Sequence, residues 1–201
     1  MFGFRGLQRQ ESYSGTESFR HIDGLINDDG RELRVVSPFI SSHYAKMLAD
    51  VARRKRVYVL VSEARGGKRF PSQEKAVALL QAGGRDLAIK PALFMLVLLA
   101  ISFALGLFLA FGVLLLVTAA VVYFGILTRM APERNLHLKM VRDAFIHEKL
   151  FVSDSVAIVG SANLTYSGTH KNIEHIEIIR DRRKIEDLRA HFDRLWRTYK
   201  H

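Results

Sequence analysis

The sequence predicts an α/β fold in which helices flank a mixed β-sheet and a two-helix hairpin interrupts the domain. The first observation behind this prediction is that short apolar segments typical of strands alternate with segments of helical periodicity. The second is a block of 38 uncharged residues, 91–128, in the middle of the chain. The third is length: 201 residues are enough for one domain with its own core.

The elements before the uncharged block follow from apolar runs and from the residues that bound them. Strands are expected at 32–40, 56–63 and 85–91. Helices are expected at 41–55 and 72–84. Each helix has a serine at its start, and the second ends at a Gly-Gly pair. Residues 1–20 are polar and contain Ser and Gly, which predicts a flexible N-terminal arm before a domain over 21–200.

After the block, the pattern of strands followed by a helix continues. The segment 135–145 is expected to be a strand or a short connector. Further strands are expected at 147–153, 156–161 and 173–181. The chain closes with an amphipathic helix, 184–200, whose apolar stripe consists of Leu188, Phe192, Leu195 and Trp196.

The uncharged block is nearly twice the ~20 residues that one membrane-spanning helix needs. We therefore expect an inserted transmembrane hairpin at 91–129, with a re-entrant hairpin as its rival and a buried pair of core helices as the weaker alternative. Both flanks are basic, beginning with Lys90 and Arg129. Since Lys and Arg favour the cytoplasmic side, the sequence predicts a multi-pass membrane protein whose remaining domain faces the cytoplasm.

The amino-acid composition limits the kinds of ligand and partner that the chain is expected to bind. The chain has no cysteine, which excludes disulfides and thiolate metal sites. Its formal charge of +10 suits a polyanion, either nucleic acid or an anionic membrane surface.

Chemistry-bearing residues gather in "FIHEKLFVSDSVAIVGSANLT", residues 145–165. Side chains alternate along a strand, so His147 and Lys149 should share one face of the sheet, as should Ser161 and Asn163. The glycine before Ser161 allows close approach of the backbone. The sequence therefore predicts a phosphate-binding set with one imidazole that can act as nucleophile, acid or base.

This segment resembles the signature of the phospholipase D superfamily. The resemblance rests on His147-x-Lys149-x4-Asp154 followed by Gly160-Ser161-x-Asn163. Five residues separate the aspartate from the glycine, where the family usually has six. Asp154 falls at the turn between two strands, so it is better placed to fix the turn than to touch a ligand. The segments "RVVSPFI", "VYVLVSE", "KNIEHIEI" and "FDRLW" also resemble such a domain.

The resemblance implies a phosphodiesterase that uses no metal or cofactor and forms a phosphohistidine. It implies catalytic roles for His147, Lys149 and Asp154, phosphate binding by Lys149, Ser161 and Asn163, and support from Glu174. A near-repeat, His137-x-Lys139 with Asp143, lacks the spacing and the Gly-Ser-x-Asn. The reaction needs two histidines, so the resemblance implies a homodimer in which each chain supplies one.

Three functions remain open on the sequence. The first is a membrane-anchored phospholipase D-like enzyme that hydrolyses or transfers phospholipid head groups. The second is a membrane-tethered endonuclease of the same superfamily, acting on DNA or RNA. The third is a non-catalytic membrane adaptor that binds polyanions through its basic surface.

Overall fold

We describe a computed structural model of the protein. The residues that it describes are 11–63, 71–81, 97, 100, 101, 112–120 and 135–199. The chain divides into two compact units: Met1–Gly84 together with Asn135–His201, and Arg85–Arg134. The first unit contains the sheet and the whole of the His147–Asn163 motif.

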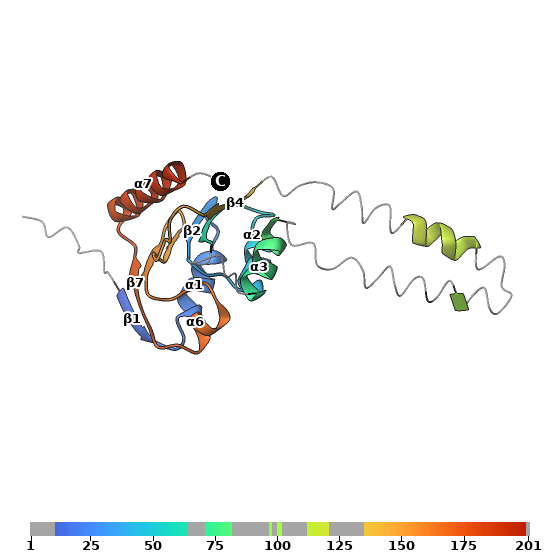
Figure 1. Ribbon diagram of the computed structural model, residues 1–201, viewed down its shortest axis with the longest axis horizontal. Coiled ribbons are helices and arrows are strands. Elements are labelled where there is room, and N and C mark those ends of the chain that lie inside the picture. Colours follow the sequence, from blue (N-terminus) through green and yellow to red (C-terminus); the bar gives the residue numbers. More distant parts are fainter. Residues whose placement is uncertain are drawn as a thin grey trace, which may run out of the picture. The chain divides into compact units, whose positions relative to one another are not determined.

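A mixed sheet of seven strands forms the centre of the first unit (Figure 1). The strands are β1 (Glu11–Gly15), β2 (Glu32–Val36), β3 (Arg56–Ser62), β4 (Leu136–Val141), β5 (Leu150–Val152), β6 (Ala157–Gly160) and β7 (Glu174–Ile179). Their order across the sheet is β1-β7-β6-β5-β2-β3-β4. The β2–β3 and β3–β4 pairs are parallel, and the remaining neighbours are antiparallel. The α/β class with a mixed sheet is therefore confirmed.

Helices cover both faces of this sheet. They are α1 (Phe19–Ile26), α2 (Ser42–Val51), α3 (Pro71–Gln81), α6 (Tyr166–His170) and α7 (Arg182–Thr198). Side chains of α1, α2 and α3 pack into one hydrophobic cluster with residues of the sheet, and α7 packs into a second cluster. β3 shows why two clusters arise: Val57, Val59 and Val61 enter the first, whereas Leu60 enters the second.

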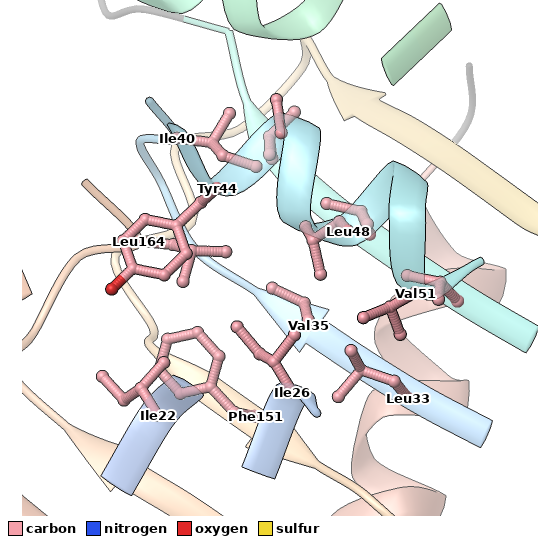
Figure 2. Packing of buried hydrophobic residues seen from close by; sticks show 14 of the residues in the cluster. Ile22, Ile26, Leu33, Val35, Ile40, Tyr44, Leu48, Val51, Phe151 and Leu164 are labelled. Carbon is pink, nitrogen blue, oxygen red and sulfur yellow. The ribbon is translucent and has the colours of Figure 1, made fainter. Parts of the chain in front are cut away.

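The larger cluster holds the domain together. Figure 2 shows the side chains of α1 and α2 packed over β2, with Phe151 of β5 among them. Ile22, Leu33 and Leu48 are fully buried. Full burial of such a side chain contributes about 1.5–3 kcal/mol. On the other face, Ile185 and Phe192 of α7 are buried, which confirms the predicted amphipathic closing helix.

Several boundaries differ from the prediction. Residues 11–15 lie inside the predicted flexible arm but form β1, which pairs with β7 at the sheet edge. Helix α1 also begins inside that arm, at Phe19. The strand predicted at 147–153 begins only at Leu150. The segment left open as strand or connector is β4. The strand predicted at 85–91 lies outside the described residues.

The second unit holds the uncharged block, most of which lies outside the described residues. Residues 112–120 are helical, and Val113 and Leu116 are exposed there. Among the residues described, none of the helices combines the length and the apolar character required to cross a membrane.

Candidate active site

Three neighbouring strands bring the motif together at one end of the sheet. β5 and β6 are antiparallel, with Leu150 opposite Val159, so the start of β5 lies beside the end of β6. Gly160 at the end of β6 lies opposite Ile176, which places the start of β7 alongside. The parallel strands β2 and β3 end at this same edge, where open α/β sheets generally bind their ligands.

Gly160 is needed for this convergence. A Cβ atom at this position would lie 2.2 Å from the carbonyl oxygen of His175 and 2.8 Å from the Cα of Ile176. No side chain fits at such distances, so any substitution would push β6 and β7 apart. The predicted close approach of the backbone is therefore present.

His147 and Lys149 are in direct contact. The Lys149 Nζ lies 3.2 Å from both ring nitrogens of His147 and donates a hydrogen bond of 2.7 Å to the His147 carbonyl oxygen. The two residues precede β5, so strand alternation does not bring them together; the lysine chain folds back over the histidine. His147 is exposed, whereas Lys149 is buried.

The electrostatics of Lys149 involve Glu174. Burial lowers the pKa of the Lys149 ammonium, and the nearby negative charge of Glu174 opposes this by raising it. Glu174 is itself buried at the start of β7. The pair therefore places a poorly hydrated cation beside an exposed imidazole, an arrangement suited to an anionic group such as phosphate.

Ser161 is held in place by Glu174. Its hydroxyl donates to Glu174 Oε2 in a short hydrogen bond and accepts the backbone N–H of His175 at 3.0 Å. The other Glu174 oxygen, Oε1, accepts a hydrogen bond of 3.2 Å from Asn172 Nδ2. The hydrogen bonds described for Glu174 thus go to Ser161 and Asn172. The supporting role that the resemblance implies for Glu174 is therefore directed at Ser161 and Asn172 in the described part of the chain.

Asn163 lies two residues further along the chain. Its Oδ1 is buried and has no hydrogen-bond partner in the part of the chain that the structure describes. The side chain lines a pocket of about 440 Å³ together with Phe39, Gln73, Tyr166 and Asn172. Asn172, which lines the pocket and donates to Glu174, therefore connects this pocket to the Ser161–Glu174 pair.

Asp154 does not lie with the other motif residues. It sits at the β5–β6 turn, the end of β5 opposite to Lys149. Its Oδ2 accepts the backbone N–H of Arg31 at 2.6 Å, and its Oδ1 is paired with Arg189 of α7. Burial would raise the pKa of this carboxyl, but the bonds from Arg31 and Arg189 outweigh burial and lower it. Asp154 thus lies at the turn, as expected, and its contacts are with Arg31 and Arg189 and not with the other motif residues.

The near-repeat on β4 also lies apart from the motif. The His137 ring stacks on Tyr58 with centroids 4.7 Å apart. Lys139 Nζ donates to the carbonyl oxygens of Trp196 and Tyr199, at 2.5 and 2.9 Å, and so satisfies the C-terminal end of α7. Asp143 is exposed. These contacts give the His-x-Lys of β4 a structural role.

Sequence reasoning missed the groups that hold His147 in position. Ser62 at the end of β3 accepts the N–H of Ile146 at 2.8 Å and donates to its carbonyl oxygen at 3.1 Å. Phe145 lies beside the His147 ring, with centroids 6.0 Å apart. Glu148 points elsewhere and pairs with His191 of α7 at 2.9 Å. The available signals were the serine that ends β3 and the aromatic residue two positions before the histidine.

The motif lies in a segment that is similar to a known protein family. A protein family described as "Cardiolipin synthase, PLD-like domain" matches residues 121–196, which include every residue of the motif. A comparison with curated proteins finds no match. Among the described residues, no group of three His, Asp or Glu side chains could hold a metal ion.

Solved structures show the same fold. NucT from Helicobacter pylori is 11% identical, with a TM-score of 0.56, over 95% of this chain and 97% of its own. Nuc from Salmonella typhimurium, a phospholipase D family member, is 14% identical, with a TM-score of 0.56, over 96% of this chain and 97% of its own. Phosphatidylserine synthase from Haemophilus influenzae is 14% identical, with a TM-score of 0.51, over 94% of this chain and 38% of its own. Residues 121–196 are therefore similar to a phospholipase D-like domain, and the chain has the α/β fold of these solved structures.

Proposed function

We propose that the chain is a phosphodiesterase that cleaves nucleic acid through a phosphohistidine intermediate. The observation that carries this proposal is the contact of His147 with the buried Lys149, which lies near the Ser161–Glu174 pair. A nucleophile next to a poorly hydrated cation is the arrangement that phosphoryl transfer requires. The phospholipase D-like domain supports the same class of reaction.

The reaction proceeds in two balanced steps. A ring nitrogen of His147 attacks phosphorus, the bond from phosphorus to the leaving ester oxygen breaks, and a second histidine gives that oxygen a proton. The second histidine then takes a proton from water, whose oxygen attacks phosphorus while the phosphorus–nitrogen bond breaks. Lys149 and Asn163 stabilise the negative phosphoryl oxygens in both steps. Ser161 assists them, positioned by Glu174.

Nucleic acid is the substrate that the comparisons and the charge favour. The names of Nuc and NucT indicate nucleases, and the chain matches almost the full length of both. The formal charge of +10 suits a polyanionic backbone. The second candidate substrate is a phospholipid head group, which the uncharged block 91–128 favours because it would hold the site beside a bilayer.

Two further features belong to this proposal. The block 91–129 forms a two-helix membrane hairpin, and the phosphodiesterase domain faces the cytoplasm. Two copies of the chain form a homodimer, so that the His147 side chains of both act in one reaction. The support for the first is the charge pattern of the sequence, and for the second the single complete motif.

A side-by-side assay tests the function. Full-length protein in detergent is given labelled single-stranded DNA, RNA, and phospholipid in mixed micelles, all with EDTA. Cleavage of DNA or RNA is expected, and it should disappear in His147→Ala, whose side chain is exposed and contributes little to the core. Cleavage of phospholipid only would replace the nuclease by the second candidate. Activity that needs added magnesium would refute the mechanism.

A further inference from the structure

We propose that the pocket beside Asn163 receives a nucleobase adjacent to the scissile phosphate. This inference rests on the proposed nuclease function and adds a binding site for the base. The pocket has a volume of about 440 Å³. Its lining comes from the segment after β2, the start of α3, the first residues of α6 and the segments on either side of α6.

The pocket meets the proposed phosphate site at two points. Asn163, which we place at the phosphate, forms part of its wall. Asn172 forms another part and donates to Glu174, the residue that holds Ser161. A phosphodiester bound at His147 would therefore carry its next substituent to the mouth of this pocket.

The ten described residues that line the pocket are all uncharged. The wall contrasts with the rest of a chain whose formal charge is +10. Among these described residues, a second phosphate would find no ammonium or guanidinium, and a cationic head group would find no carboxylate. The lining fits an uncharged group that forms hydrogen bonds.

Three of the lining residues carry polar atoms that lack a partner. These are the Ser41 hydroxyl, Gln73 Oε1 and Asn163 Oδ1, which are buried and unpaired within the described part of the chain. Gln73 is 6% exposed, and its Nε2 donates to the carbonyl oxygens of Ser62 and Pro38. These bonds fix the amide and leave Oε1 as the free acceptor. Unpaired buried acceptors cost free energy, which a ligand with N–H donors would recover.

Besides hydrogen-bonding groups, a site for a nucleobase needs an aromatic surface on which the base can stack, and the pocket has one. Tyr166 stacks on His170 with centroids 4.2 Å apart and an interplanar angle of 15°. His170 in turn stacks on Phe19 at 4.3 Å and 7°. Tyr166 ends this three-ring stack, lines the pocket and is 49% exposed. A planar base placed on Tyr166 would continue the stack, as bases do on aromatic platforms of single-strand-binding proteins.

Two oligonucleotides of equal length test the inference: single-stranded DNA with all its bases, and the same sugar–phosphate chain without bases. Wild-type protein should cleave the base-bearing chain with the higher kcat/KM. Tyr166→Ala should lower kcat/KM for that chain by roughly 5- to 150-fold, the loss that one stacked base implies, and should leave the abasic chain unaffected. The matched control Tyr166→Phe keeps the ring and should behave as wild type.

Ser41→Ala gives an independent readout. Ser41 precedes α2, but its side chain makes no capping hydrogen bond, so its loss should not unfold the helix. In a His147→Ala background, where chemistry is blocked, Ser41→Ala or Tyr166→Ala should weaken binding of the base-bearing chain and not of the abasic chain. Thermal melts establish that each variant is folded.

The failures of the two proposals are distinguishable. Equal cleavage of both chains by wild type, or an equal loss on both in Tyr166→Ala, would overturn the base site and leave the nuclease standing. If wild type cleaves neither chain but cleaves phospholipid, the nuclease falls and the base site falls with it. A loss of phospholipid cleavage in Tyr166→Ala would then assign the pocket to the head group.

Discussion

Substitution of Asp154 tests which residues of the motif serve stability and which serve catalysis. We expect removal of its side chain to lower stability and to leave catalysis unchanged. Asp154→Ala removes the hydrogen bond from the Arg31 N–H, at 2.6 Å, and the ion pair with Arg189. A hydrogen bond to a charged group contributes about 1.5–3 kcal/mol. The lower end applies here because Asp154 is exposed. The Arg189 pair, with side chains 27% and 36% exposed, adds about 0.2–1 kcal/mol.

The free energy of unfolding should therefore fall by about 2 kcal/mol. At about 2–4 °C per kcal/mol for a chain of this size, the melting temperature should drop by roughly 4–8 °C. The loss should also depend on pH. The pKa of Asp154 lies below its ordinary value of 3.8, so its stabilising effect is present above that value and is lost as the pH falls through the folded pKa. The difference between variant and wild type should shrink on acidification.

Lys149→Met is the counterpart of Asp154→Ala: we expect it to lose activity and to keep its stability. Burial disfavours the charged form of Lys149, so an apolar side chain of similar length should leave the free energy of unfolding within about 1 kcal/mol of wild type. By contrast, kcat should fall by ~10²–10³-fold, as expected when a donor to the transition state is lost. Urea unfolding and initial rates on one substrate measure both quantities. An Asp154→Ala protein with wild-type stability and no activity would refute the reasoning and return Asp154 to the active site.

Three other outcomes can be checked. Glu174→Gln removes the charge that raises the pKa of Lys149, so the alkaline limb of the pH–kcat profile should move to lower pH; a limb that stays in place would mean that Lys149 titrates independently of Glu174. When wild-type and His147→Ala chains pair at random, activity should fall as the square of the wild-type fraction, whereas a linear fall with a monomeric mass would refute the shared site. Reporter fusions at residue 64 and at the C-terminus should lie on the same side of the membrane, and opposite sides would contradict the hairpin at 91–129.

The sequence predicted those parts of the fold whose stability comes from burial along one short segment. β3 and the helices α2 and α7 carry apolar residues at the spacing of their own element. β1, with the sequence ESYSG, carries no such pattern, because its pairing with β7 fixes it. Helix α1 did offer a signal in Ile22, Leu25 and Ile26, but a preceding polar stretch made the region look like a loose arm. The five-residue α6 depends on one capping bond, from the Gly168 N–H to Thr165.

The sequence predicted the parts of the site that depend on neighbouring strands ending at the same edge of the sheet. It did not predict the contacts that depend on how individual side chains fold. Ser161 was correctly placed beside the start of β5 because β5 and β6 form a short antiparallel pair. His147 and Lys149 were predicted to share one face of a strand, but both precede β5, and they meet because the lysine side chain folds back over the histidine. The link from Glu174 to Ser161 and Asn172 depends on the register of β7 against β6, which no local pattern encodes.

The near-repeat on β4 is badly placed to supply the second histidine of the proposed reaction. β4 is separated from β5 by β2 and β3, and strands lie about 4.8 Å apart, so His137 starts ~14 Å from the motif strand. The His137 ring also stacks on the ring of Tyr58. The other described histidines have contacts of their own: His21 with Tyr13, His43 and His170 with Tyr166, His175 with Ser14, and His191 with Glu148. His147 itself is exposed and open to a partner. The described residues of one chain thus leave only His147 available for a reaction that, as proposed, needs two histidines. We therefore expect a second copy of the chain to supply the other.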